Sequence, residues 1–363
     1  MPSPTGLVWW SPIHDPDEFR AIPVFPFFVD SYPLLEECVQ KGCFQHKTSC
    51  DTHAPCKRKE LTMKAPWITS LVALVSLLSL QACSVAPEIT GTADDEFLPA
   101  RAAVFTENFS LPQSVRDYYR SAYGKSGSAL KTALRSIISA GYVDKGYSGL
   151  WTTYKTSDVT PAGKIWDLYS STSLNGTGTT ASYWYTPVTS QCGTYSAEGS
   201  CYNREHMIPQ STFGEKAPMV SDAHHVTATD GKVNGMRSNY PHGNVATASW
   251  TSKNGGKLGS GTSAQGYTGT CFEPRSDAKG DIARIYFYFC VRYYGNTSCT
   301  AWASMNAGAK LKSWAQTLYR SWASADPVSQ KERTRNNAIF SIQKNRNPFV
   351  DYPELATMID FVN

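Results

Sequence analysis

The sequence predicts an α+β fold in which helices flank a small, irregular β region. Apolar residues follow helical spacing near both ends of residues 106–363, and residues 201–245 contain strand and turn signals before a short helix. The chain has 363 residues, of which 41% are hydrophobic, and it can therefore bury a sizeable core. Its net charge of +4 does not by itself indicate a nucleic-acid binder. We expect residues 106–363 to form a single, mainly helical domain with long loops.

The N-terminal part of the chain has the pattern of an export signal. Residues 63–83 begin with Met63-Lys64, continue with eighteen uncharged residues and end in small residues. Because such a signal belongs at an N-terminus, we expect residues 1–62 to be a disordered, mis-called upstream extension and residues 84–105 to be a linker. A single membrane anchor is the alternative, since eighteen apolar residues can just span a bilayer.

Cysteine usage agrees with export. Cys83 follows a sequence that resembles a bacterial lipoprotein processing site, so a lipid-anchored outer-membrane form and a secreted or periplasmic form are both open. Beyond it lie five cysteines, and two pairs of them are nine residues apart, which suits short disulfide loops. Five is an odd number and the connectivity cannot be deduced. The pairs are Cys192 with Cys201 and Cys290 with Cys299.

Further elements follow from local patterns. Helices are expected where apolar residues recur at helical spacing, and residue composition predicts short strands and long loops over residues 146–199. The helix over 277–294 is expected to be buried because apolar and aromatic residues dominate it. The predicted helices cover residues 112–122, 128–140, 277–294, 309–323, 329–343 and 353–361.

Residues 201–245 carry the candidate chemistry. They contain Arg204-Glu205-His206, then His224-His225, and then Asn234, Arg237 and Asn239 after a helix N-cap at Thr229 or Asp230. This order predicts a strand, a loop, a second strand and a helix within about forty residues.

The residue types suit cleavage of a phosphodiester. His206 can serve as the general base, because its unperturbed pKa is roughly 6.5. Glu205 and Asn234 offer oxygen ligands that leave most of an octahedral Mg²⁺ shell to water and phosphate. Arg204 or Arg237 can contact phosphate. Because strand neighbours point to opposite faces, Glu205 and His206 reach one cleft only if the strand ends or bulges there.

These strings resemble the bacterial endonuclease I family of nonspecific nucleases of the ββα-metal, or His-Me finger, type. The resemblance rests on YSGLW, PAGKIWDLYS, YNREH, SDAHH, TDGKVNGMRSNYP and SIQKNRNPFVDYPEL, in this order along most of residues 115–360. It implies a nuclease that uses Mg²⁺, with Mn²⁺ or Ca²⁺ as substitutes, and that leaves 5′-phosphate ends. DNA is the implied substrate, and RNA is open as a second one.

Carried over by position, the resemblance makes His206 the base and Glu205 and Asn234 the metal ligands. Two departures from the family pattern stand out. Ala228 occupies a usual Pro position, and the loop after His206 lacks the arginine of some relatives, so that Lys216 is its main basic side chain. We expect His224, His225 and Asn239 to support the site, with at least one of the two histidines making a hydrogen bond there. A monomer without a sequence-specific partner is expected.

Two alternatives remain open at this point. One is a zinc-dependent phosphoesterase that uses the histidines at positions 206, 224, 225 and 242, although no HExxH motif is present. The other is a catalytically silent, surface-attached DNA-binding protein. Metal identity distinguishes the first from a magnesium nuclease, and nicking of plasmid DNA distinguishes the second.

Overall fold

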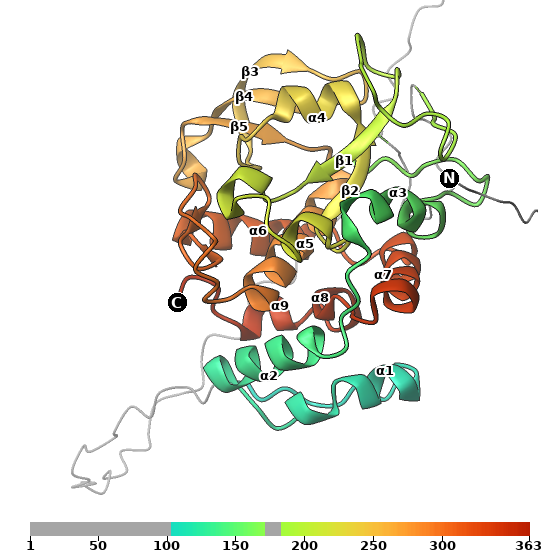
Figure 1. Cartoon of the computed structure of the whole chain (residues 1–363). Coiled ribbons are helices and arrows are strands. Elements are labelled where there is room, and N and C mark those ends of the chain that lie inside the picture. Colours follow the sequence, from blue (N-terminus) through green and yellow to red (C-terminus); the bar gives the residue numbers. More distant parts are fainter. Residues whose placement is uncertain (1–102, 171–182) are drawn as a thin grey trace, which may run out of the picture. The chain divides into compact units, whose positions relative to one another are not determined.

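The structure is a computed structural model that describes residues 103–170 and 183–363, all within one compact unit, Thr92–Asn363. In this part of the chain, helices combine with small antiparallel sheets, which confirms the α+β class (Figure 1). The expected upstream extension, the export signal with Cys83 and most of the linker lie outside the described residues.

The domain begins slightly before the predicted boundary at residue 106. Phe105, assigned to the linker, is buried and donates its backbone N–H to the carbonyl of Lys125 at 2.8 Å. The helices α1 (Gln113–Tyr118) and α2 (Gly127–Ser139) then form where they were predicted. Residues one helical turn apart give α2 its buried stripe. These are Leu130, Leu134 and Ile138.

Helix α3 (Gly146–Ser157) contradicts the strands predicted from residue 146 onward. Its Tyr, Trp and Thr residues favour strands locally. However, Leu150 and Tyr154 lie one turn apart, and both are buried in a cluster that includes Ile339. Tertiary packing therefore overrides the local preference. Between residues 158 and 201 the described chain has long loops and isolated β-bridges, but no strand.

The predicted strand, loop, strand and helix are present. Strand β1 (Tyr202–His206) pairs antiparallel with β2 (Val226–Asp230), and α4 (Gly231–Arg237) follows β2 directly. The side chain of Asp230 accepts a hydrogen bond of 2.8 Å from the backbone N–H of Val233, which confirms the predicted N-cap. Helix α4 packs on both strands, so these elements form one local unit.

A second sheet was not predicted. It consists of β3 (Val245–Thr251), β4 (Lys257–Gly261) and β5 (Thr270–Glu273), paired antiparallel in that order. Most of β3 is exposed, and β4 is rich in Gly and Ser, so neither strand has a strong apolar alternation. The sheet matters for the site because Phe272 of β5 forms a β-bridge with His242.

Helix α5 (Lys279–Arg292) is the predicted buried helix, and every residue between its two ends is buried. Figure 1 shows it near the middle of the described fold, and α2, α6 and α8 pack on it. The helix predicted over 309–323 begins later, at Ser313, and the one predicted over 353–361 is reduced to one short helix at Leu355–Met358. The remaining elements are β6 (Met305–Asn306), β7 (Lys310–Leu311), α6 (Ser313–Ala325), α7 (Gln330–Gln343), α8 (Pro348–Asp351) and α9 (Leu355–Met358).

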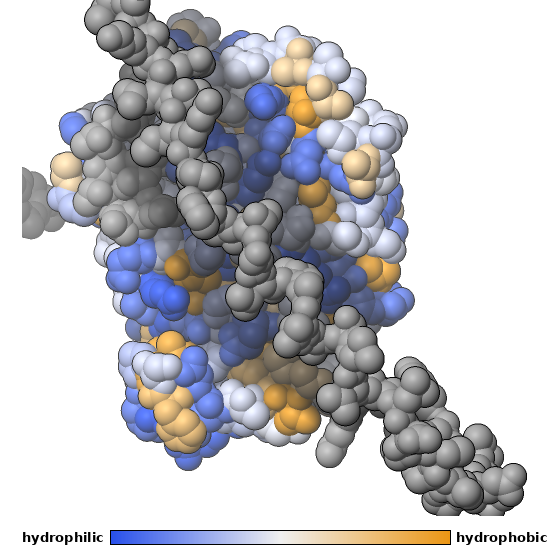
Figure 2. Space-filling model, turned by 180° about the vertical axis from the view of Figure 1, so that it is seen from behind, coloured by the Kyte–Doolittle hydropathy of each residue, from blue (hydrophilic) through white to orange (hydrophobic). Residues whose placement is uncertain are grey.

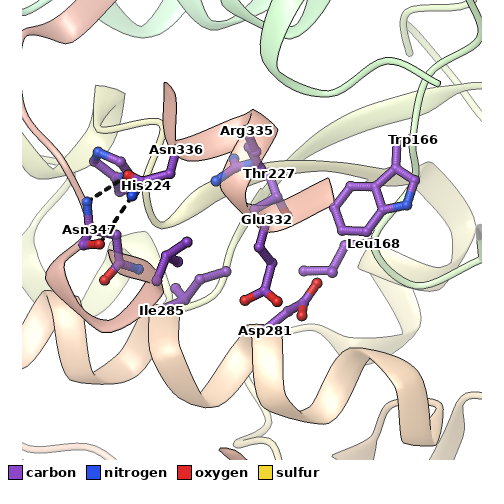
Figure 3. A pocket seen from close by; sticks show the side chains of 11 residues that line it. Trp166, Leu168, His224, Thr227, Asp281, Ile285, Glu332, Arg335, Asn336 and Asn347 are labelled. Atoms are coloured by element: carbon purple, nitrogen blue, oxygen red, sulfur yellow. Dashed lines mark hydrogen bonds between the residues drawn. The ribbon is translucent and has the colours of Figure 1, made fainter. Parts of the chain in front are cut away.

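A small interior cavity of about 30 Å³ lies among β2, α5 and α7. In Figure 3 the carboxylates of Asp281 and Glu332 approach one another on one side of it, and His224 lies on the other. A space of this size holds roughly two water molecules. It is too small for a nucleotide and is therefore not a substrate site.

The exposed surface carries scattered apolar residues. Where coloured atoms are visible in Figure 2, orange apolar residues are interspersed with blue polar ones. Such single residues are normal on a protein surface. Among the described helices, none is both long and apolar enough to cross a membrane.

Candidate active site

Strand β1 presents three predicted site residues in succession. Arg204 and His206 share one face, where both contact Tyr147 of α3, whereas Glu205 faces Arg237 of α4. The register with β2 contains no bulge, but the strand ends at His206. Of the two features expected to bring Glu205 and His206 together, only the strand end is present. No described contact joins the two side chains directly.

His206 is arranged as a neutral base. Its Nε2 lies 3.1 Å from the carbonyl oxygen of Val220, which can only accept, so Nε2 carries the ring proton. Burial lowers the pKa of His206 to about 3, and the nearby ring of His225 acts in the same direction. The unprotonated Nδ1 makes no hydrogen bond to the described residues. Its lone pair therefore has no hydrogen-bond donor among the described residues.

The Glu205 carboxylate is only 2% exposed, and its two oxygens differ. Oε1 accepts hydrogen bonds of 2.8 Å from Arg237 and from the hydroxyl of Tyr169. Oε2 accepts none from the described residues. Burial raises the pKa of Glu205, while Arg237 and Tyr169 act in the opposite direction. One oxygen is thus fixed and the other is left for a ligand.

Arg237 does not fit the predicted phosphate contact. Its side chain is 1% exposed, and all three guanidinium nitrogens donate to groups of the protein. Burial by itself lowers its pKa, but Glu205 and nearby tyrosines raise it above the ordinary value. Arg237 therefore holds Glu205 and the backbone at the end of β1. Its acceptors are Glu205 Oε1 and the carbonyls of His206, Met207 and Tyr240.

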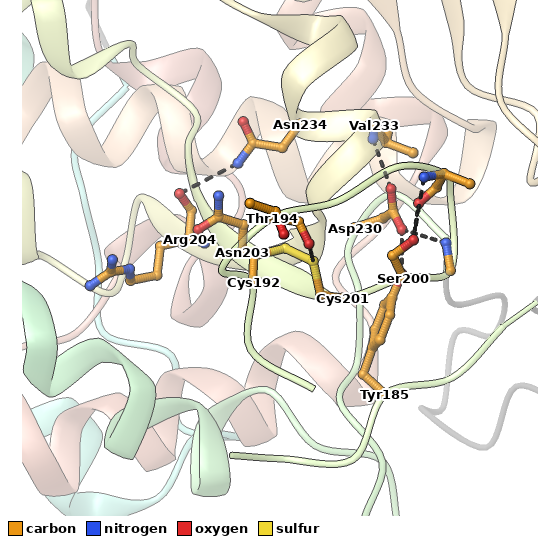
Figure 4. The surroundings of a disulfide bond; sticks show 12 residues. Tyr185, Cys192, Thr194, Ser200, Cys201, Asn203, Arg204, Asp230, Val233 and Asn234 are labelled. Carbon is orange, nitrogen blue, oxygen red and sulfur yellow. Dashed lines mark hydrogen bonds between the residues drawn. A yellow bond between two sulfur atoms is a disulfide. The ribbon is translucent and has the colours of Figure 1, made fainter. Parts of the chain in front are cut away.

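Asn234 projects from α4 towards β1. Its Nδ2 lies 3.5 Å from the carbonyl oxygen of Arg204, a long hydrogen bond that is visible in Figure 4. The side chain is half-buried, and its Oδ1 accepts no hydrogen bond from the described residues. Asn234 and Glu205 therefore each keep one oxygen without a partner, on adjacent elements. This donor set fits a hard divalent cation.

Arg204 is the cation best placed to meet phosphate. Its guanidinium carbon lies 3.5 Å from the ring centre of Tyr147 and 4.4 Å from that of Trp151, and Nη1 donates to the Tyr147 carbonyl at 3.1 Å. The side chain is half-buried and forms no ion pair among the described residues. It shares its strand face, and its contact with Tyr147, with His206.

The remaining predicted residues support the loop after β1 or lie at its rim. His225 donates Nε2–H to the Met219 carbonyl at 2.5 Å, next to the Val220 carbonyl that holds His206. This confirms that at least one of the two histidines makes a hydrogen bond in this unit. His224 instead bonds the carbonyl of Asn345 and is buried. Exposed Lys216 and Asn239 contact Ser298 and Ser211 through side-chain hydrogen bonds.

A zinc site built from four histidines does not fit the structure. His206, His224 and His225 each direct Nε2 to a different backbone carbonyl, and His242 lies between two tyrosine hydroxyls. Among the described residues, no three His, Cys, Asp or Glu side chains are grouped to hold a metal. The zinc-dependent alternative thus lacks its ligand cluster.

Sequence reasoning missed Tyr169 and His242. Tyr169 directly contacts Glu205, and His242 Nε2 lies 2.8 Å from the Tyr169 hydroxyl. His242 was considered only as a zinc ligand. Both residues come from loops distant in sequence from β1, and only the string around Tyr169 in the family resemblance could have drawn attention to it.

The disulfide Cys192–Cys201 is confirmed, whereas Cys290 and Cys299 are buried free thiols. The loop between the paired cysteines packs against α4 (Figure 4). A Cβ at Gly231 would overlap the sulfur of Cys192, and one at Gly235 would overlap the hydroxyl of Tyr195. The disulfide loop therefore helps to position the helix that carries Asn234.

We expect removal of this disulfide by Cys192→Ser/Cys201→Ser to lower the free energy of unfolding by about 2–4 kcal/mol, because the cross-link restricts the unfolded chain. Urea unfolding measures the loss. The double variant should no longer respond to reductant, which makes it its own control. Thiol titration of unreduced, denatured residues 84–363 should find three thiols, and five would exclude the disulfide.

Comparison with known proteins identifies the family of the chain. The chain matches the Endonuclease I family over residues 126–354. It is 32% identical over 319 residues to "Extracellular ribonuclease" of Bacillus amyloliquefaciens, covering 82% of this chain and 99% of that relative. It is 33% identical over 252 residues to a Bacillus subtilis (strain 168) protein of the same name, covering 67% and 77%.

A more distant relative carries the family's own name. The chain is 28% identical over 130 residues to "Endonuclease-1" of Buchnera aphidicola subsp. Baizongia pistaciae (strain Bp), covering 36% of this chain and 46% of that relative. The family match spans more than half of the sequence and includes every candidate site residue. The chain therefore belongs to the Endonuclease I family and is a nuclease.

Proposed function

We propose that this chain is an exported, magnesium-dependent, sequence-nonspecific endonuclease that hydrolyses DNA and RNA to 5′-phosphate ends. In this proposal β1, β2 and α4 act as a ββα-metal (His-Me) finger. The observation that carries it is the contact of His206 Nε2 with the Val220 carbonyl oxygen at 3.1 Å, which assigns the ring proton to Nε2. Nε2–H is committed to the Val220 carbonyl, so Nδ1 is free to take a proton from water.

Glu205 and Asn234 would hold the metal through the oxygens that have no partner in the described structure. When bound, a divalent cation supplies charge stabilisation for the phosphate and the leaving oxygen. The chain's own residues do the rest. His206 accepts the proton of the attacking water, and Arg204 orients the phosphate against the strand face that it shares with His206.

Substrate breadth follows from which groups line the site. Arg204, Glu205, His206 and Asn234 suit a metal and the sugar-phosphate backbone, and backbone contacts carry no direct sequence information. The name extracellular ribonuclease of one relative supports activity on RNA and export, and the name Endonuclease-1 of another supports cleavage within a nucleic-acid chain.

The test is cleavage of plasmid DNA and of RNA by purified protein after chelation, followed by addition of Mg²⁺ or Zn²⁺. We expect Mg²⁺, but not Zn²⁺, to restore cleavage of both substrates. Glu205→Gln and Asn234→Ala should weaken Mg²⁺ binding, the first more than the second because it removes a charge as well as a ligand. Unchanged Mg²⁺ affinity in both variants would move the metal site elsewhere, and no nicking at any metal concentration would favour the silent DNA-binding alternative.

A further inference from the structure

A closed ring of hydrogen-bonding groups lies behind Glu205. From Glu205 Oε1 it runs to the Tyr169 hydroxyl at 2.8 Å and on to His242 Nε2 at 2.8 Å. His242 Nδ1 lies 3.0 Å from the hydroxyl of Tyr286, which lies 3.1 Å from the carbonyl oxygen of Met207. Arg237 closes the ring, because its two terminal nitrogens bond Glu205 and Met207. The side chains of the ring are all buried.

The ring has fewer protons than contacts. Burial and the charge of Arg237 hold the pKa of His242 well below its usual range, so the imidazole is neutral and carries one N–H. Each tyrosine hydroxyl also has one proton. Three protons are therefore available for the four contacts between Glu205 and the Met207 carbonyl, so one of these contacts always lacks a hydrogen-bonding proton. The tautomer of His242 determines on which side of the imidazole this contact lies.

The charge of Glu205 helps to determine which of the four contacts lacks a proton. The Glu205 carboxylate is an ionic acceptor, and a hydrogen bond to such a group is stronger than one to a neutral carbonyl. The Met207 carbonyl already accepts a hydrogen bond of 2.6 Å from Arg237, so it is satisfied without Tyr286. A proton on Nδ1 would leave either the Glu205 contact or the 2.8 Å contact between the Tyr169 hydroxyl and Nε2 without a proton, whereas a proton on Nε2 confines the loss to the Tyr286 side of the imidazole. In the favoured arrangement Tyr169 donates to Glu205, Nε2–H of His242 donates to Tyr169, and Tyr286 donates to Nδ1.

We propose that Tyr169 and His242 are positioning residues for Glu205. Nε2–H of His242 donates to the Tyr169 hydroxyl, so this hydroxyl donates its own proton to Oε1. Oε2 is then the oxygen that ligates the metal. This inference rests on the proposed metal role of Glu205. It assigns Tyr169 the task of orienting a ligand, a role in which outer-shell hydrogen bonds commonly change metal affinity by about 10- to 100-fold.

The test compares two buried tyrosines on opposite sides of the same histidine. Tyr169→Phe removes the hydroxyl that faces Glu205, and Tyr286→Phe removes the one that faces Met207. With the full chain and Mg²⁺ alone, calorimetry should show metal affinity about 10- to 100-fold weaker in Tyr169→Phe and close to wild type in Tyr286→Phe. Both variants lose one buried hydroxyl, so a similar loss of thermal stability is expected and serves as the matched reference.

A second measurement reads the tautomer directly. Nitrogen NMR of labelled wild-type protein should show His242 protonated at Nε2 and unprotonated at Nδ1. A proton on Nδ1, or equal metal affinities in the two variants, would overturn the inference. Glu205→Gln separates this from failure of the proposed function: if that variant also binds Mg²⁺ like wild type, the metal site is wrong, whereas weakened binding confines the failure to Tyr169.

Discussion

Replacing His206 with alanine is expected to reduce the single-turnover rate of cleavage by roughly 10²- to 10⁴-fold, which is the usual contribution of a general base. The physical reason is specific to one atom. Val220 fixes the ring so that Nδ1 lacks a proton. Nδ1 of the neighbouring His225 also has no hydrogen-bond partner among the described residues, but that side chain is 0% exposed. Affinities for Mg²⁺ and nucleic acid should change little, because a base contributes little to the ground state.

A second histidine provides the control for this experiment. His224 is also buried and also directs Nε2 to a carbonyl, that of Asn345, but it lies beside the interior cavity rather than at the strand end. His224→Gln should lower stability while the folded protein cleaves at the normal rate. Added imidazole should partly restore His206→Ala. Near wild-type turnover in His206→Ala would remove the assignment of the base.

Replacing Arg237 with methionine is expected to cost about 3–5 kcal/mol of unfolding free energy, the range for breaking a buried ion pair from one side. The change leaves the 2%-exposed carboxylate of Glu205 without its charged partner and removes a hydrogen-bond donor from each of three backbone carbonyls. Chemical denaturation with a folding probe such as tryptophan fluorescence measures it. We therefore expect Arg237 to affect activity through the fold and the position of Glu205, rather than through contact with phosphate.

Two further variants make this prediction specific. Arg135→Met removes an exposed arginine on α2 and should alter stability by less than about 0.5 kcal/mol. Combining Arg237→Met with Glu205→Gln removes the stranded charge, so the double variant should lose less than the sum of the single changes. If Arg237→Met instead proved as stable as wild type and only weakened nucleic-acid binding, its role as a phosphate contact would be restored.

Local signals predicted the unit that carries the site. Asp230 as an N-cap, the strands on either side of the loop and the helix with Asn234 all follow from short-range patterns, because capping and strand pairing over this distance depend on neighbouring residues. Helix α3 shows the opposite case. Its strand-favouring residues are overruled by contacts with α7, and no local pattern contains that information.

The sequence did not predict which polar side chains are buried around the site. Arg237 was considered as a phosphate contact, yet it occupies the interior, where arginine rarely lies, and bonds protein groups. Tyr169 and His242 approach Glu205 from separate loops, so their roles depend on the tertiary fold. Export of the chain and the role of Cys83 remain predictions from sequence, since those residues lie outside the described part.

The ring behind Glu205 also has a kinetic consequence. The residues of the ring extend along the chain from Tyr169 to Tyr286. The chain segments that carry them must be brought together before these hydrogen bonds can form. Contacts of such high sequence separation are slow to form. The carboxylate of Glu205, the proposed metal ligand, is therefore expected to be oriented only late in folding. A nascent or partly folded chain would then leave nucleic acid around it uncut, which delays hydrolysis until the whole domain has assembled.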